Sequence, residues 1–392
     1  MFRRYIYILC GIVLILGLLV TGCTASDQSP QQQPQQPQEP EKPAPGLSAT
    51  PAPSVPSPTA PAPGGPSGWQ DMLPENLALT TYDIGGGSHL VTAANAEAIF
   101  RVLGQRVRII PASSDAARVY PLTTGDAQFM MVTSGVAVSA LQGTGSTFSK
   151  SEWGPQPMRA AWFANRSTAG WAVKPDSDIQ SFADVKGKKI AINIGSGTST
   201  LVAKALLAYA GLTEDDIEWI QYPNNTGTER AIARGEADVG LMWFADPPVR
   251  EVHMASGFRV LQMPADDTAA WERAWEVAPW FYSVTLDDDV TAAGASKENP
   301  YQVGASAQAY HTFATVPDDV VYAFCHAMVE TIEEAGELHR RCLEASLEVQ
   351  LPGTWSGPEP WHPGAVKFFK EMGVWNAEEE SAWQAKMAAL GQ

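Results

Sequence analysis

Apolar and polar positions divide the chain into three stretches. Residues 5–20 form an almost unbroken apolar run, and residues 24–68 are polar and rich in Pro, Gln, Ala and Ser. From Leu77 onward, short apolar segments alternate with longer ones bounded by residues that start and stop helices. Strands that alternate with helices build parallel sheets covered by helices. The pattern therefore predicts an α/β body that follows a short apolar leader and a linker.

The body contains two successive blocks of strands and helices. The first is predicted to have strands at 77–82, 106–110 and 127–132 and helices at 89–103, 113–124 and 134–141. The second is predicted to have strands at 189–193, 217–222, 237–243 and 258–263 and helices at 181–185, 200–210, 228–234 and from Pro247 onward. A helical tail over 317–390 is expected to pack back on the first block. Because ligands of such sheets bind beyond the carboxyl ends of the strands, two facing blocks predict a cleft between two lobes.

Each block opens with a glycine-rich turn between a strand and a helix, Gly85-Gly86-Gly87-Ser88 and Gly195-Ser196-Gly197-Thr198. A helix start presents free N–H groups and a partial positive charge of about half a unit, which suits a carboxylate or a phosphate. Helix capping would explain either turn alone, whereas their equivalent places in two lobes favour ligand binding. The predicted ligand-binding residues at helix starts are Gly87, Ser88, His89, Ser134, Ser196, Gly197, Thr198 and Ser199.

Aromatic residues stand at or just beyond several predicted strand ends. Trp162, Trp243 and Phe244 are predicted to wall the pocket, and burial in the core is the alternative for each of them. The basic residues that could meet a ligand carboxylate near these strand ends are Arg159, Arg166 and Arg230.

Charge and motifs exclude several classes of function. The chain has 26 Lys and Arg against 43 Asp and Glu, and this net charge of −17 disfavours nucleic acid and anionic lipid as partners. The sequence contains no G-x-S-x-G, H-E-x-x-H or P-loop motif and no Cys/His cluster with zinc spacing. We therefore expect a protein that is not an enzyme and that uses no cofactor and no metal.

Residues 1–22 have the features of a signal peptide, because a short basic start precedes an apolar run that is short for a membrane span. The run ends in Leu-Val-Thr-Gly before Cys23, which resembles a lipobox, so Cys23 is predicted to be lipidated and to anchor the protein to a membrane. An uncleaved membrane anchor is the alternative. Residues 23–68 are predicted to comprise this cysteine and a disordered linker that cannot bury enough apolar area to become ordered. In either case the body lies outside the cytoplasm, at the cell surface or in the periplasm.

Two further cysteines, Cys325 and Cys342, lie in the helical tail on either side of Gly336. Outside the cytoplasm they could form a disulfide between two helices. Two buried free thiols are the alternative, and the sequence leaves both open.

Four motifs follow one another along the body. Residues 192–198 read Ile-Asn-Ile-Gly-Ser-Gly-Thr, residues 234–240 read Arg-Gly-Glu-Ala-Asp-Val-Gly, residues 317–322 read Pro-Asp-Asp-Val-Val-Tyr, and residues 362–373 run from His-Pro-Gly-Ala-Val to Lys-Glu-Met-Gly. In this order they resemble the TAXI family of TRAP-transporter solute receptors, and the similarity covers about residues 77–391. The first-lobe loop differs from the family's usual Gly-Gly-x-Tyr, because Leu90 stands at the place of the tyrosine.

The resemblance implies an α/β fold of the type II periplasmic-binding-protein kind, with two lobes around a ligand cleft joined by two crossover strands. Residues 77–165 plus 284–392 would form lobe 1, and residues 166–283 would form lobe 2. The protein would capture a small anionic organic solute, an organic acid or amino acid, and deliver it to TRAP membrane permease subunits driven by an ion gradient. The alternative is a ligand-sensing module of the same fold that docks on a signalling receptor.

Overall fold

The computed structural model describes residues 68–392 with the exception of 151, 291, 352–358 and 392. The predicted signal peptide, Cys23 and nearly all of the predicted linker lie outside the described residues. Among the helices that are described, none has the length and the apolar character needed to cross a membrane.

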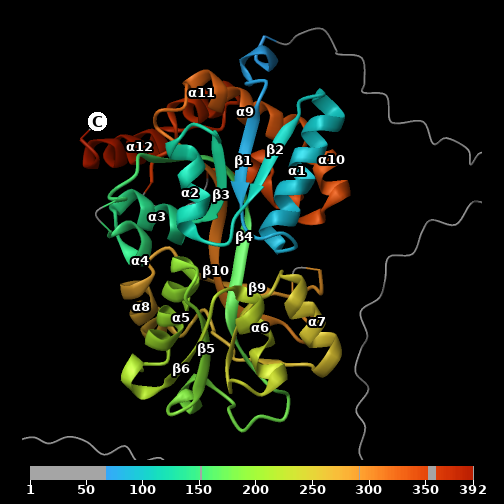
Figure 1. Ribbon diagram of the computed structural model, residues 1–392, viewed down its shortest axis with the longest axis vertical. Coiled ribbons are helices and arrows are strands. Elements are labelled where there is room, and N and C mark those ends of the chain that lie inside the picture. Colours follow the sequence, from blue (N-terminus) through green and yellow to red (C-terminus); the bar gives the residue numbers. More distant parts are fainter. Residues whose placement is uncertain (1–67, 151, 291, 352–358, 392) are drawn as a thin grey trace, which may run out of the picture. The chain divides into compact units, whose positions relative to one another are not determined.

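Two α/β lobes are joined by two long strands, β4 (Met158–Val173) and β10 (Tyr301–Phe313), as Figure 1 shows. The two strands pair antiparallel, from Met158 opposite Phe313 to Ala169 opposite Gly304. The 16 residues of β4 span about 50 Å at roughly 3.3 Å per residue, which is enough to run through both lobes. The structure therefore confirms the predicted fold class, two lobes joined by two crossover strands.

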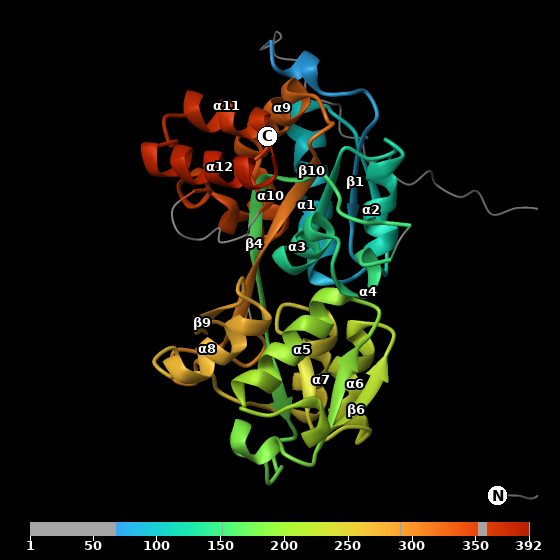
Figure 2. The ribbon, with the colours of Figure 1, turned by 90° about the vertical axis from the view of Figure 1, so that its left-hand side faces the viewer.

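Lobe 1 contains the elements before β4 and after β10. Its strands and helices are β1 (Leu77–Thr81), β2 (Val107–Pro111), β3 (Phe129–Thr133), α1 (Gly87–Leu103), α2 (Asp115–Thr123), α3 (Ser134–Gln142), α4 (Gly145–Phe148), α9 (Asp318–Glu330), α10 (Ile332–Leu338), α11 (Pro363–Glu371) and α12 (Ala377–Ala389). β1 pairs parallel with β2 and β3, and β3 pairs antiparallel with β10. The helical tail packs on this lobe as predicted, because α9 and α11 share a buried cluster with β1 and α1 (Figure 2).

Lobe 2 contains the elements between the two crossover strands. They are β5 (Lys189–Asn193), β6 (Glu218–Tyr222), β7 (Gly240–Trp243), β8 (Arg259–Val260), β9 (Tyr282–Leu286), α5 (Gly197–Tyr209), α6 (Asn225–Arg234), α7 (Pro247–Ser256) and α8 (Thr268–Val277). β5 pairs parallel with β6, whereas β7 and β8 pair with β4, and β9 pairs with β10. The division into lobes by residue number stays a proposal, because β4 and β10 continue from one lobe into the other.

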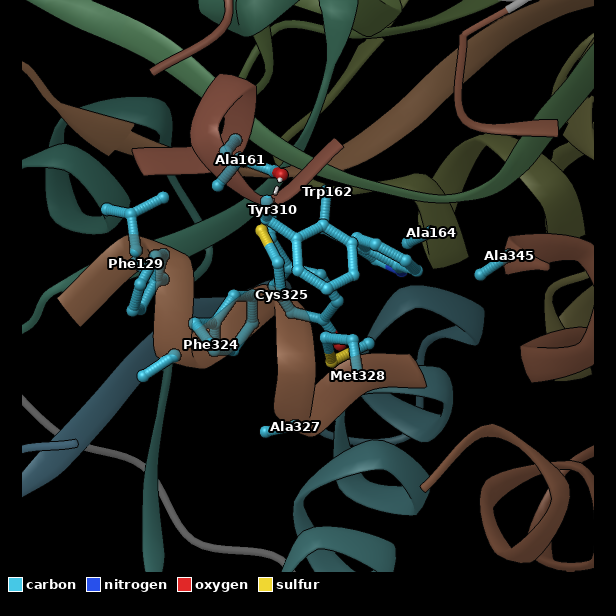
Figure 3. Packing of buried hydrophobic residues seen from close by; sticks show 14 of the residues in the cluster. Phe129, Ala161, Trp162, Ala164, Tyr310, Phe324, Cys325, Ala327, Met328 and Ala345 are labelled. Carbon is cyan, nitrogen blue, oxygen red and sulfur yellow. Dashed lines mark hydrogen bonds between the residues drawn. The ribbon is translucent and has the colours of Figure 1, made fainter. Parts of the chain in front are cut away.

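The lobe 1 core explains why one predicted pocket residue lies elsewhere. Trp162 on β4 is fully buried, and its ring centroid lies 6.0 Å from that of Phe368 and 6.1 Å from that of Phe369, both on α11. Figure 3 shows it among other aromatic side chains of this cluster. The prediction that Trp162 walls the pocket is wrong, because the helical tail covers the face of β4 on which its ring lies.

The two cysteines of the tail are both free and buried, so the disulfide hypothesis is wrong. The thiol of Cys325, on α9, donates to the Ala161 carbonyl of β4 at 3.4 Å, as the dashed line in Figure 3 shows. The thiol of Cys342 donates instead to the Val91 carbonyl of α1 at 3.8 Å. The two sulfur atoms therefore face different elements of lobe 1. Burial raises the pKa of Cys342 to about 12 and raises that of Cys325 as well.

Both thiols should resist alkylation in the folded protein and react after unfolding without any reductant, because burial keeps them protonated and out of contact with the reagent. Mass spectrometry of the peptides that contain Cys325 and Cys342 measures this directly. Peptides that stay joined until a reductant is added would show a disulfide and contradict the structure.

His362 caps the last helix but one through a neutral ring nitrogen. It is the N-cap of α11, and its Nδ1 accepts the N–H of Gly364 at 3.1 Å. The side chain is fully buried, and burial lowers the pKa of His362 to about 4. Protonation of Nδ1 would remove the acceptor, so the cap needs the neutral ring.

Because the pKa of His362 is lower in the folded than in the unfolded chain, its contribution to stability is complete above about pH 6.5 and is lost as the pH falls towards 4. A shift of this size corresponds to about 3 kcal/mol of unfolding free energy between pH 7 and pH 4. Urea unfolding of the full chain at both pH values, compared with His362→Asn, measures it. Asparagine also caps helices but does not titrate. On going from pH 7 to pH 4, the variant should therefore lose about 3 kcal/mol less unfolding free energy than the unchanged chain. Equal losses in the two proteins would contradict the role of His362 as a neutral cap.

Candidate ligand-binding site

A cavity of about 370 Å³ lies between the lobes. The starts of α1, α2 and α3 border it from lobe 1, and those of α5, α6 and α7 border it from lobe 2. Each of these helices follows a strand whose carboxyl end is directed to the cleft, as expected for ligand sites in α/β sheets. The wall residues at these starts are Gly86, Gly87, Ser88, Ser113, Thr133, Ser196, Thr198, Ser199, Asn224, Asn225, Thr226, Asp246, Pro247 and Pro248.

Side chains at the starts of α5 and α6 are ordered by hydrogen bonds to each other. The side-chain oxygen of Asn225 accepts from Asn193 Nδ2 at 2.6 Å and from the Ser199 hydroxyl at 2.9 Å. Asn224, the N-cap of α6, accepts the N–H of Gly227 at 2.9 Å. The polar wall of lobe 2 is therefore held in place without a solute.

Arg118 is a buried cation beside the cavity and is only 1% exposed. Its guanidinium donates to the Asp115 carboxylate and, at 2.7 Å, to the Ala112 carbonyl. The guanidinium carbon also lies 4.0 Å from the ring centroid of Tyr82. Burial raises the pKa of Tyr82, although the Arg118 charge opposes that effect, so Tyr82 presents a neutral hydroxyl. The Arg118 charge is largely neutralised by Asp115.

Trp243 brings an unused hydrogen-bond donor to the lobe 2 wall. It lines the cavity and is 5% exposed, and its indole N–H has no acceptor among the described residues. A buried donor without an acceptor costs about 1–3 kcal/mol. A solute with an acceptor atom at this place would remove that cost.

Two carboxyl groups lie side by side on the lobe 2 side of the cavity. Glu229 is fully buried, and burial together with the neighbouring Asp246 raises the pKa of Glu229 well above its usual range. Burial also raises the pKa of Asp246, whereas the hydrogen bond from the Gly87 N–H lowers it. These effects favour a neutral Glu229 beside an ionised Asp246, so the pair adds less negative charge to the site than its composition suggests.

The crossover strands contribute a wall of their own. Ser167 of β4 and Gln308 of β10 both line the cavity. The amide of Gln308 donates to the Ser88 hydroxyl at the start of α1, at 2.5 Å. A solute in the cavity would therefore lie against the strands that join the two lobes.

The cleft is closed, because the lobes bond to each other across it. The N–H of Gly87 in lobe 1 donates to Asp246 in lobe 2 at 2.9 Å. The N–H of Gly197 in lobe 2 donates to Asp115 in lobe 1, also at 2.9 Å. Two helix starts that were predicted to bind a ligand anion thus hold carboxylates of the protein itself.

Most of the predicted site residues gather at this cavity. Those that line it are Gly87, Ser88, Ser196, Thr198, Ser199, Trp243 and, among the candidate cations, Arg230. Gly197 lies between them and takes part through its N–H. Their contact with a solute stays a prediction.

Other predicted residues do not line the cavity, and here the prediction is corrected. Ser134 is the first residue of α3, and its buried hydroxyl donates to the Ala307 carbonyl of β10 at 3.3 Å instead of facing the cavity. Phe244 is 2% exposed in a core cluster of lobe 2, because it faces away from its neighbour Trp243. His89 is the third residue of α1, in its first turn as predicted, but it is not among the residues that line the cavity.

Several residues of the cavity wall were not predicted from the sequence. Tyr82, Arg118 and Asn225 were not singled out, although Asn224 before a helix is a typical cap. Asp246 was also missed, and here a signal existed, because it directly precedes the two prolines that begin α7. Of the other candidate cations, Arg159 is buried and Arg166 pairs with Glu344, away from the cavity wall.

The described residues, at this site and elsewhere, contain no group of three or more His, Cys, Asp or Glu side chains that could hold a metal ion. The polar groups at the cavity are instead hydroxyls, amides, N–H groups and a few charged side chains. This donor set is suited to hydrogen bonding of a polar organic solute.

The family of the chain follows from comparison with known proteins. The NMT1-like family matches residues 86–373, and the chain belongs to that family. The match spans both lobes and the cavity between them.

Several solved structures are similar at low identity. They include the periplasmic aliphatic sulphonate binding protein SsuA of Escherichia coli (17% identity, 80% of this chain and 84% of that chain covered, TM-score 0.45). PhnD1 of Prochlorococcus marinus, in complex with methylphosphonate, is similar at 9% identity, with 76% and 99% of the two chains covered and a TM-score of 0.45. The alkanesulfonate-binding protein SsuA of Xanthomonas axonopodis pv. citri, bound to MOPS, is similar at 13% identity, with 77% and 94% covered and a TM-score of 0.43. These likenesses are too distant to carry an argument about the ligand of this chain.

Proposed function

We propose that this chain is an extracytoplasmic receptor that captures a small anionic organic solute between its lobes. The observation that carries the proposal is the convergence of helix starts from both lobes on one cavity of about 370 Å³. Sites for small molecules have volumes of roughly 300–1,000 Å³. A solute that contacts both lobes binds the closed form better than an open one and so shifts the population towards closure.

The donors at the cavity favour an anionic solute over a neutral one. Helix starts carry partial positive charge, and the Trp243 N–H lacks an acceptor among the described residues. Arg230 also lies on the wall, where it is paired with Glu251. The carboxylates of Asp115 and Asp246 already sit at two of the helix starts. Their presence supports the view that these starts suit carboxylates.

We infer the partner from the resemblance to TAXI receptors, which implies TRAP permease subunits that take up the solute. The lipobox-like sequence before Cys23 supports a lipid anchor, and residues 23–68 would then give the body freedom to move near the membrane. A sensing module that docks on a signalling receptor would use the same cavity and differ only in its partner. We propose no catalytic step, cofactor or metal.

Thermal unfolding of the full chain, purified in detergent, tests the receptor proposal against a panel of dicarboxylic acids, oxo-acids, amino acids, aromatic acids and uncharged sugars. At 100 times its Kd a solute adds about 2.7 kcal/mol to stability, which raises the Tm by several degrees in a protein of this size. We expect a rise with small acids and none with sugars or with the amide of the same acid. A rise with sugars alone would contradict the anionic class. The absence of any rise, with no small molecule retained in native mass spectrometry, would overturn the receptor proposal.

The double substitution Ser196→Ala and Thr198→Ala tests the site itself. Hydrogen bonds to a charged group contribute about 1.5–3 kcal/mol each, so we expect at least a tenfold loss of affinity for the acid found in the panel, measured by calorimetry. The matched control is Ser181→Ala with Thr213→Ala. These residues cap two short 3-10 helices of lobe 2, Phe182–Val185 and Glu214–Asp216, and lie off the cavity. Unchanged affinity in the first variant would place the site elsewhere.

A further inference from the structure

The starts of α1 and α5 are capped by carboxylates of the opposite lobe. Gly87, the first residue of α1, donates its N–H to Oδ1 of Asp246 at 2.9 Å. Gly197, the first residue of α5, donates its N–H to Oδ2 of Asp115, also at 2.9 Å. The two bonds are reciprocal, because each lobe gives one N–H and one carboxylate.

The sequence around Asp246 leaves its carboxylate without a donor in its own helix. Asp246 is the N-cap of α7, yet its side chain makes no capping bond there. An N-cap side chain normally accepts from the second or third helical N–H. The second residue is Pro248, which has no N–H, and the N–H of Val249 bonds to the backbone carbonyl of Asp246 at 3.0 Å. The carboxylate is therefore available to Gly87.

Asp115 is held towards lobe 2 by an ion pair. The guanidinium of Arg118, one turn along α2, binds Oδ1 of Asp115 and leaves Oδ2 for Gly197. Both charged side chains are buried, at 2% and 1% exposure. The start of α2 does not need Asp115, because Ser114 is its N-cap and accepts the N–H of Ala117 at 3.3 Å.

Glycine at the first helical position is what allows each carboxylate to come close. A Cβ on Gly87 would stand 2.9 Å from Asp246 Oδ1, and a Cβ on Gly197 would stand 2.9 Å from Asp115 Oδ2. Neither glycine has a positive φ. Glycine is therefore required at these positions because the opposite lobe comes so close, and not because of the local backbone conformation.

Close packing beside these bonds shows that they belong to one interface. The hydroxyls of Thr133 in lobe 1 and Thr198 in lobe 2 lie 2.9 Å apart. A Cβ on Gly135 of α3 would stand 2.6 Å from the ring of Trp280, which belongs to the core of lobe 2. The lobes thus have no room for an added methyl group at this contact.

We propose that Asp115 and Asp246 hold this receptor closed, each by capping a helix start of the opposite lobe, so that the N–H groups of Gly87 and Gly197 bind the other lobe instead of the solute. The purpose of these contacts rests on the proposed function, since only a receptor that opens needs them. The solute charge is then left to the hydroxyls at the start of α5 and to the start of α6, where Asn225 and Thr226 line the cavity. A solute anion that reached the N–H of Gly87 or Gly197 would compete with closure.

Hydrogen exchange of the full chain without added solute tests the proposal. In Asp246→Ala we expect the peptide that contains Gly87 to exchange at least tenfold faster. The peptide that contains Gly197 should also exchange at least tenfold faster, although the variant leaves α5 and Asp115 intact, because both bonds depend on the same closure. The matched control is Asp267→Ala. Asp267 caps a helix within lobe 2 by accepting the N–H of Ala270 at 3.3 Å, so its removal should leave the exchange of both peptides unchanged.

Gly135→Ala tests closure without removing a carboxylate. Alanine is favoured inside a helix, while its Cβ would meet the ring of Trp280 at 2.6 Å. Both peptides should again exchange at least tenfold faster while circular dichroism shows a folded protein. If only the Gly87 peptide exchanged faster in Asp246→Ala, the bond would be a local cap and the proposal would be overturned. Unchanged exchange of both peptides in Gly135→Ala would also overturn it. The proposed receptor function is tested separately: it would be overturned if no solute bound, whatever the exchange experiments showed.

Discussion

The antiparallel pairing of β4 with β10 is the constraint on which the rest of the structure depends. The strands of lobe 1 add to this pair through β3, and β7, β8 and β9 add to it in lobe 2, where β5 and β6 form a separate two-stranded sheet. The strands β1, β2, β3, β5, β6 and β7 end at the cleft, so the helices that follow them begin there. Because Ser167 and Gln308 of the same pair line the cavity, the connection between the lobes is also a wall of the candidate site.

An acidic chain can still offer an anion a favourable site when the positive polarity comes from its backbone. The two cations at the cavity are both paired, Arg118 with Asp115 and Arg230 with Glu251. The helix starts, by contrast, carry partial charges that no side chain needs to supply. The net charge of −17 therefore says little about the polarity inside the cleft, where hydroxyl and amide side chains line the wall beside a few charged groups.

Local signals in the sequence predicted most elements of the two blocks but missed β4, β9, β10 and α8; the two crossover strands were expected only from the family resemblance. The local signals also failed where a side chain's direction decided the outcome. Glycine-rich turns and the proline pair gave the helix starts at the cleft, within about two to three residues. Trp162 could not be placed, because nearly every residue of β4 is buried, so no alternation of polar and apolar residues marks its faces. Trp243 and Phe244 are neighbours in the sequence, and successive side chains point to opposite faces; only one of them could line the cavity.

The contacts between the lobes were beyond prediction from local pattern, since Gly87 and Asp246 are 159 positions apart and Gly197 and Asp115 are 82 apart. For the contact between Gly87 and Asp246, the sequence nevertheless shows that both groups lack a local partner. A helix that begins after Gly85 and Gly86 has no side chain to cap it, and an aspartate before two prolines has no nearby N–H to accept. A helix start without a cap and a carboxylate without a hydrogen-bond donor are complementary. In a fold with two lobes whose helices begin at one cleft, closure of the cleft brings the two groups together.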